Sequence, residues 1–178
     1  MSQSTPVNGL IIAAPSSGSG KTVITLGILK ALKRAGHRIV SAKVGPDYID
    51  PAYHTVATGR PSYNLDSWAM RSETLLGLCT SLEEHANLIV CEGVMGLFDG
   101  ANSGAGSTAD ISALTGWPIV LVVDARGQGA SAAAIVQGFA NHRPDIDLLG
   151  VIFNRVGGPN HRRSLETATH QANPGISI

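Results

Sequence analysis

The sequence is poor in aromatic residues and carries no excess charge of either sign. Only 4% of its 178 residues are aromatic, and thirteen lysines and arginines are balanced by thirteen aspartates and glutamates. This balance argues against an electrostatic nucleic-acid binder, which usually presents a basic face or tail. With 43% hydrophobic and 15% charged residues, the chain is not disordered, and its length fits a single domain.

Long apolar runs and cysteine clusters are also missing. No apolar run reaches the roughly 18–20 residues that a membrane helix needs. The N-terminal residues 1–6 contain no charged segment of the kind that begins a signal peptide. The two cysteines, Cys79 and Cys91, have neither metal-ligand spacing nor a disulfide framework. We therefore expect a cytoplasmic protein without membrane segments or a zinc site.

What the chain does contain is an alternation of apolar runs and helical patterns. Strands are predicted at 10–14, 38–44, 88–91, 118–123 and 148–153, and helices at 21–35, 72–84, 108–115, 130–141 and from 160 onward. Residues 45–70 are expected to be mostly loop. Because the strands have apolar residues in succession rather than in alternation, both faces should be buried. This pattern predicts an α/β fold, a mainly parallel sheet with helices on both faces and ligands at the carboxyl ends of its strands.

The most informative motif is the segment 14–22, which reads Ala-Pro-Ser-Ser-Gly-Ser-Gly-Lys-Thr between the first predicted strand and helix. This is the context of a phosphate-binding P-loop, although Pro15 stands where the usual pattern has glycine. Backbone N–H groups at a helix start bind anions, lysine neutralises phosphate charge, and a threonine hydroxyl can bind Mg²⁺. The predicted ATP-binding residues are Ser17, Gly18, Ser19, Gly20, Lys21 and Thr22. The alternative is a chance glycine-rich turn.

Acidic side chains follow the second and third predicted strands. Asp47 and Asp50 come after Lys43, and Asp99 comes after Glu92, which ends a strand as a Walker-B acid does. Carboxylates gathered at one edge would repel one another without a cation, so we expect Mg²⁺ there, with Asp47 and Glu92 among its ligands. The alternative for Asp47 and Asp50 is turn chemistry beside proline.

Together these segments resemble a known family. Residues 14–22, 43–51, 64–66 and 92–100 are similar to the cobyrinic acid a,c-diamide synthases and their sister enzymes that act on hydrogenobyrinic acid. Further similar stretches lie at 107–110, 121–124 and 150–156, so the resemblance reaches to about residue 164. It implies the P-loop fold of dethiobiotin synthetase, which also resembles the ParA/MinD ATPases.

The resemblance implies an ATP-dependent ligase of cobalamin biosynthesis. Such enzymes phosphorylate the a and c carboxylates of a corrin, and ammonia then displaces phosphate from each acyl phosphate. Because the first step joins two anions, Mg²⁺, Lys21 and Lys43 would have to screen their charges.

The resemblance also implies individual residue roles. Asp47, Asp50 and Glu92 match acids that support ATP, metal and acyl-phosphate formation. Tyr48 and Ile49 match positions near the corrin, and Asp99 matches an acid linked to ammonia use. Asn154 matches the residue that reads adenine, since an amide can pair with both the N6 donor and the N7 acceptor.

The family normally carries a C-terminal glutamine amidotransferase domain, and nothing in this sequence supplies one. Cys79 and Cys91 are predicted to be packing residues rather than nucleophiles. Residues 172–178 resemble the start of another strand. We therefore expect residues 1–178 to be one truncated ATP-binding domain, which would take ammonia from solution or from a glutaminase domain. The cobalt content of the corrin, the order of amidation and a possible homodimer stay open.

Two other functions compete with this interpretation. A dethiobiotin-synthetase-like ligase for another carboxylate would share the P-loop but gives no reason for residues 46–51. A ParA/MinD-like ATPase switch would usually carry a second, earlier lysine in the P-loop, and residues 15–19 contain none. His54 is left open between a ligand contact and no functional role.

Overall fold

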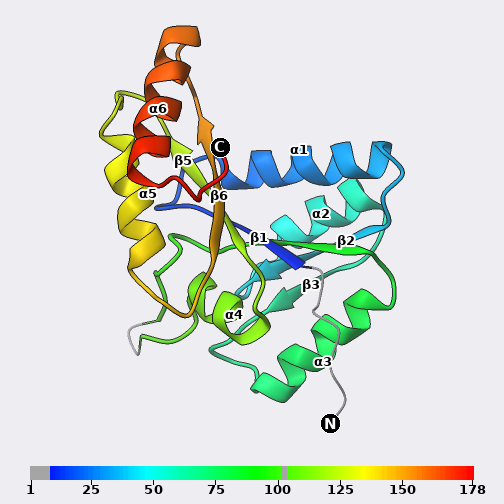
Figure 1. Ribbon diagram of the computed structural model, residues 1–178. Helices are drawn as coiled ribbons and strands as arrows, with labels where there is room; N and C mark the ends of the chain where they lie inside the picture. Colours follow the sequence, from blue (N-terminus) through cyan, green and yellow to red (C-terminus); the bar gives the residue numbers. More distant parts are fainter. Residues whose placement is uncertain (1–8, 102–103) are drawn as a thin grey trace.

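The computed structural model describes residues 9–101 and 104–178, which form a parallel six-stranded sheet flanked by helices (Figure 1). The strand order is β3-β2-β4-β1-β5-β6, and each neighbouring pair is parallel. The strands are β1 (Gly9–Ala13), β2 (Ile39–Val44), β3 (Ser62–Leu65), β4 (Leu88–Glu92), β5 (Ile119–Asp124) and β6 (Leu148–Asn154). The predicted fold class is confirmed.

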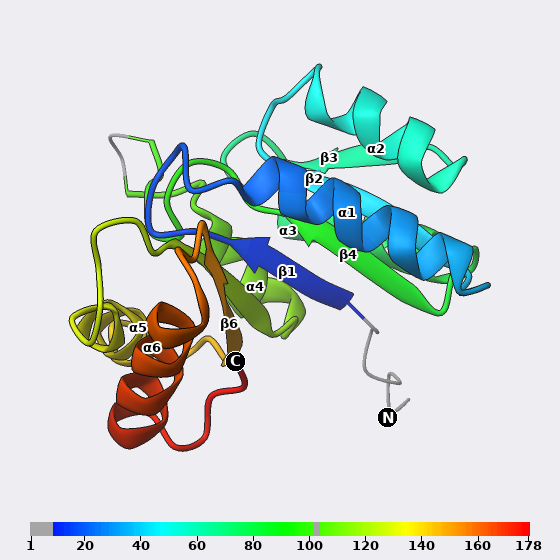
Figure 2. The same ribbon diagram turned by 90° about the horizontal axis from the view of Figure 1, so that it is seen from above.

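Six helices cover the sheet within the described residues. They are α1 (Lys21–Arg34), α2 (Asp50–Thr58), α3 (Ser72–Glu83), α4 (Thr108–Thr115), α5 (Ala132–Asn141) and α6 (Pro159–Ala172). In Figure 1, α1 and α2 lie above the central strands, and α3 and α4 lie below them. Viewed from above, α1 passes in front of the sheet (Figure 2). No helix in this described part of the chain is both long enough and apolar enough to cross a membrane.

Burial on both faces explains the apolar strands. Neighbouring residues of β1 enter different cores: Ile11 packs with Leu75 of α3, whereas Ile12 packs with Leu29 of α1. Both isoleucines are fully buried. A strand in this position cannot alternate between apolar and polar residues, because each of its faces is covered by helices.

The prediction of loop over residues 45–70 is wrong, because α2 and β3 lie within it. Pro51 stands in the first turn of α2, where its missing N–H costs nothing. The sequence interpretation treated this proline as part of a turn. Strand β3 is a four-residue edge strand paired only with β2, too short to give a clear apolar run.

At the opposite edge, the last residues are extended, as predicted. Ser177 forms a parallel bridge with Gly150 of β6. The Ser177 N–H donates to the Leu149 carbonyl at 3.1 Å, and its carbonyl accepts from the Val151 N–H at 2.8 Å. The chain therefore begins to pair with the outer edge of β6.

Candidate nucleotide and carboxylate site

The predicted P-loop forms a tight turn between β1 and α1. Gly18 and Gly20 have φ values of 82° and 93°, which lie in the left-handed region that favours glycine. A Cβ atom on Gly20 would lie 2.2 Å from the amide nitrogen of Asn154, so this position has no room for a side chain. The turn leads directly into the N-terminus of α1, where Lys21 and Thr22 stand. This is the backbone arrangement that binds phosphate groups.

Asn154, the last residue of β6, and Arg155, which follows it, hold the P-loop from outside. Asn154 Nδ2 donates to the Ser19 carbonyl at 2.9 Å, and Arg155 donates to the Gly18 carbonyl at 2.9 Å. Arg155 also pairs with Asp124 at the end of β5, at 2.5 Å. The structure thus places Asn154 against the loop backbone as a brace. Its role in reading adenine stays a prediction.

On the inner side of the loop, the Glu92 carboxylate joins β4 to α1 and α2. The Thr22 hydroxyl donates to Glu92 Oε1 at 2.5 Å, and His54 Nε2 lies 2.8 Å from Oε2. The side chains of His54 and Glu92 are fully buried. A strand-end acid hydrogen-bonded to the P-loop threonine is the arrangement expected of a Walker-B residue.

Lys43 is a buried cation surrounded by oxygen atoms. Its ammonium group donates to the carbonyls of Gly93 at 3.2 Å and Val44 at 3.4 Å. It also lies 3.8 Å from a carboxylate oxygen of Asp47 and 3.8 Å from one of Asp50. The structure therefore brings together three of the predicted catalytic residues.

The two aspartates beside Lys43 differ in electrostatics. Burial tends to raise the pKa of Asp47, but N–H donors from Asp50 and Ile49 and the charge of Lys43 outweigh it, so the pKa is lowered. Burial raises the pKa of Asp50, and the negative charges of Glu92 and Asp47 raise it further. Asp47 is therefore the more strongly ionised partner, and Asp50 is the one that holds a proton more readily.

Lys21 belongs to the same electrostatic group. Burial lowers its pKa, the charge of Lys43 acts in the same direction, and Glu92 and Asp50 act against them. Its ammonium group donates to the Met95 carbonyl at 3.4 Å. The P-loop lysine thus faces the loop that follows β4, and it lies near Glu92 and Asp50.

Asp99 occupies a different place from the other predicted acids. Its Oδ2 accepts from the Gly96 N–H at 2.9 Å, which closes a turn in its own loop. A Cβ atom on Gly96 would lie 2.6 Å from the Pro15 carbonyl, so this turn packs against the P-loop backbone. Asp99 itself is exposed. The structure places it beside the P-loop, and its link to ammonia use stays a prediction.

The predicted substrate residues are at the surface of the same edge. Tyr48 is 90% exposed and Ile49 is 67% exposed. Beside them lies an apolar pocket of about 220 Å³, lined by Gly45, Pro46, Asp66, Trp68, Val94, Met95, Gly100, Ala101 and Gly106. A ligand at this edge would therefore contact exposed apolar side chains next to Asp47 and Asp50, the carboxylates that pair with Lys43.

The predicted metal ligands are only partly together. Thr22 and Glu92 are in contact, whereas Asp47 pairs with Lys43. Across residues 9–101 and 104–178, no group of three or more His, Cys, Asp or Glu side chains could hold a metal ion. Thr22 and Glu92 do suit Mg²⁺ in a nucleotide site, where phosphate oxygens and water supply most ligands.

Other predicted features are confirmed or lie elsewhere. Cys79 and Cys91 are buried, and burial raises the pKa of both thiols, that of Cys79 to about 11, as expected of packing residues.

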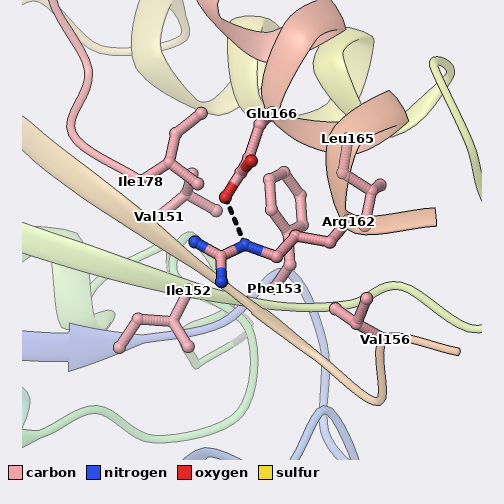
Figure 3. A pocket seen from close by; sticks show the side chains of 8 residues that line it. All are labelled: Val151, Ile152, Phe153, Val156, Arg162, Leu165, Glu166 and Ile178. Atoms are coloured by element: carbon pink, nitrogen blue, oxygen red, sulfur yellow. Dashed lines mark hydrogen bonds and ion pairs between the residues drawn. The ribbon is translucent and has the colours of Figure 1, made fainter. Parts of the chain in front are cut away.

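A second pocket, of about 320 Å³, lies between β6 and α6 (Figure 3). It is lined mainly by apolar side chains, and on its α6 side Arg162 and Glu166 form an ion pair at 2.6 Å. It contains none of the P-loop or carboxylate residues.

Sequence reasoning missed two residues of the site. Arg155 follows the residue that was expected to read adenine, and it donates to the Gly18 carbonyl of the P-loop. His54 was left open, yet it contacts Glu92. The available signal was its spacing of four residues from Asp50, which on a helix places both side chains on one face. That signal was hidden because α2 was not predicted.

Comparison with known proteins identifies a nucleotide-binding family. Residues 10–178 match the family model described as the CobQ/CobB/MinD/ParA nucleotide binding domain. The chain is 51% identical over 162 residues to hydrogenobyrinate a,c-diamide synthase of Rhizobium meliloti and 53% identical over 163 residues to that of Brucella ovis. These matches cover 91% of this chain but only 38% and 37% of the relatives. The chain thus spans less than two fifths of their length.

Solved structures share the fold at low sequence identity. Chloroplast FtsY from Physcomitrella patens has a TM-score of 0.62 and 21% identity, over 99% of this chain and 58% of that one. The hydrogenase maturation factor HypB from Archaeoglobus fulgidus has a TM-score of 0.59 and 16% identity, over 97% and 80%. These likenesses show a common fold. Taken with the family match, they show that the chain belongs to the CobQ/CobB/MinD/ParA nucleotide-binding domain family.

Proposed function

We propose that this domain carries out the ATP-dependent amidation of the a and c carboxylates of hydrogenobyrinate in cobalamin biosynthesis. The observation that carries the proposal is the buried Lys43, set between Asp47 and Asp50 and adjoining the Thr22–Glu92 pair of the nucleotide site. The names of relatives about half identical to this chain favour the metal-free corrin over cobyrinate.

The first step transfers the γ-phosphoryl group of ATP to an oxygen of the substrate carboxylate. A new O–P bond forms, the bond to the β-phosphate oxygen breaks, and ADP leaves. Lys21 in the P-loop and Lys43 beside Asp47 and Asp50 would supply the positive charge that screens the approach of the two anions. Mg²⁺, held by Thr22 and Glu92 when bound, would neutralise further phosphate charge.

In the second step ammonia attacks the acyl carbon, phosphate leaves, and the nitrogen loses a proton. We assign Asp50 to receive that proton, since its raised pKa makes it the better acceptor of the pair. Asp47 stays ionised and keeps Lys43 in place. Tyr48 and Ile49 would contact the apolar body of the corrin from the open side.

The two buried thiols bear on the source of the nitrogen. A glutaminase needs an accessible, reactive cysteine, and neither Cys79 nor Cys91 provides one. We therefore propose that these residues use free ammonia, or ammonia delivered by a glutaminase domain. A homodimer is a further proposal, to be tested by sedimentation with and without ATP.

The test is phosphate release from Mg-ATP with ammonia and either hydrogenobyrinic or cobyrinic acid, with the corrin mass measured in parallel. We expect phosphate release, and a corrin mass that shows OH replaced by NH₂. Both effects should be larger with hydrogenobyrinic acid than with cobyrinic acid. ATP hydrolysis without a change in corrin mass, together with ATP-dependent dimerisation, would instead support a ParA/MinD-like switch. Failure to bind ATP would contradict the nucleotide site itself.

A further inference from the structure

Glu92 has a separate partner for each carboxylate oxygen. Oε1 accepts from the Thr22 hydroxyl at 2.5 Å, and Oε2 lies 2.8 Å from His54 Nε2. Thr22 comes from α1 and His54 from α2. The orientation of the carboxylate is therefore set by two helices, and a change at either partner would turn it.

The hydrogen-bonding state of His54 follows from its surroundings. Its Nδ1 atom is buried and has no hydrogen-bond partner. A protonated Nδ1 would be a buried donor without an acceptor, which native structures avoid. Because Glu92 Oε2 can accept, the ring proton belongs on Nε2, and His54 donates to Glu92. The imidazole thus makes one directed hydrogen bond and no other.

The same helix also carries an acid of the carboxylate site. Asp50 begins α2 and His54 stands four residues later, so both project from one face. Asp50 reaches Lys43 and His54 reaches Glu92. Thr58 Oγ1 donates to the His54 carbonyl at 2.9 Å, one turn further along. A single helix therefore connects the substrate side of the site with the nucleotide side.

We propose that His54 is a positioning residue for Glu92. By donating to Oε2 it keeps Oε1 directed at Thr22 in the P-loop, and it ties this geometry to the helix that presents Asp50. The proposal rests on the proposed function, in which Glu92 and Thr22 serve the metal-nucleotide site. Outer partners of metal-site ligands commonly act in this way, and their loss costs about 10–100-fold in metal affinity or activity.

The first test needs no substitution. Nitrogen-15 NMR of the histidine rings in the unmodified protein should show one ring with a protonated Nε2, an unprotonated Nδ1 and a coupling across a hydrogen bond. His54→Gln identifies the signal by its disappearance. A His54 ring with the proton on Nδ1 would overturn the proposal, because Nε2 could then not donate to Glu92.

The second test compares two amides. Gln at position 54 can place its N–H near the position of Nε2, whereas the amide of Asn is one bond shorter and does not reach Glu92. Binding of a fluorescent ATP analogue is measured with Mg²⁺ and with EDTA for His54→Gln, His54→Asn and the parent. Ala57→Gly serves as the control, because it weakens the same helix in the core and does not touch Glu92.

We expect His54→Asn to lose about tenfold or more of the Mg²⁺-dependent affinity, with His54→Gln and Ala57→Gly close to the parent. Equal affinities for the two amide variants would overturn the positioning role, as would an equal loss in Ala57→Gly at a matched drop in melting temperature. If the parent binds no nucleotide, the proposed function fails as well. If the parent binds nucleotide and His54→Asn binds it equally well, the failure is confined to the role of His54.

Discussion

The two halves of the sheet's carboxyl edge both contain opposite charges, but they hold them differently. On the β2–β4 side, the Lys43 side chain is 3% exposed between Asp47 and Asp50. On the β5–β6 side, the Arg126 side chain is 67% exposed and pairs with Asp124. The two groups thus differ in their cations, since Lys43 is enclosed by the fold and Arg126 faces solvent, while Asp47, Asp50 and Asp124 are all partly exposed.

This difference appears in the pKa directions. At the exposed end, hydrogen bonds from Arg126 lower the pKa of Asp124 to about 2, with help from Arg155. The Asp124–Arg126 pair therefore favours the ionised form of each side chain. At the buried end, the pKa of Asp47 falls while that of Asp50 rises. Two neighbouring carboxyl groups whose pKa values are shifted in opposite directions are typical of sites where a proton is transferred during a reaction.

The exposed half has a mechanical use. Arg155 links Asp124 to the Gly18 carbonyl, and Asn154 holds the Ser19 carbonyl. The β5–β6 half of the edge thus braces the loop, and Lys21 of the loop lies near Glu92 and Asp50 in the β2–β4 half. The comparison predicts that substitutions on the β2–β4 side abolish chemistry, and that those on the β5–β6 side weaken binding or acid stability.

The largest effect is expected at the P-loop lysine. Lys21→Met should reduce ATP-dependent turnover by at least about 100-fold, because it removes the cation nearest the phosphates. Lys30→Met is the matched control, since Lys30 is exposed on the same helix. Phosphate release measures both variants. Comparable turnover in the two would refute the assignment of the nucleotide site.

Asp50→Asn should lower turnover by about 100-fold while leaving ATP binding intact. The melting temperature should rise slightly, on the order of 1 °C, because a neutral amide relieves the repulsion from Glu92 and Asp47. Phosphate release and a thermal melt test the two effects separately. Normal turnover would show that Asp50 has no part in the reaction, and a clear drop in melting temperature would show that its charge is stabilising.

Asn154→Ala should weaken ATP binding by about tenfold, as expected for the loss of one well-formed hydrogen bond that braces the loop. Competition with GTP separates bracing from base reading. An equal loss for both nucleotides is expected from bracing alone, whereas a loss for ATP only would establish the adenine contact. Unchanged binding of both would remove Asn154 from the site.

The smallest effect is expected in acid at the exposed cluster. Since the pKa of Asp124 is lowered from 3.8 to about 2, its ionised form adds stability above about pH 4. That stability is lost as the pH falls toward 2. Asp124→Asn should flatten this part of the melting-temperature profile. Glu166→Gln, which breaks another exposed pair, should leave the profile nearly unchanged. Identical profiles for the parent and Asp124→Asn would show that this pair is silent.

The region that sequence reasoning missed is instructive. Residues 45–70 contain three prolines, no long apolar run and several turn-forming residues, so the local pattern favoured a loop. In the structure, Asp47 accepts from the N–H groups of Ile49 and Asp50 and caps the start of α2. The helix is short, and its packing against α1 and β2 supplies what propensity does not. Short elements of this kind depend on their neighbours.

The sequence by itself determined the layered α/β fold, the P-loop and the acids at the strand ends, because periodicity and strand-to-helix order are local properties of the chain. Only the tertiary structure decided which acids share Lys43, that Asn154 and Arg155 brace the loop, and that His54 meets Glu92. The contacts of Asn154, Arg155 and His54 join residues between 31 and 137 positions apart, as with Arg155 and Asp124 or Arg155 and Gly18. Their geometry and electrostatics arise from burial, which exists only once the sheet has brought the strand ends together.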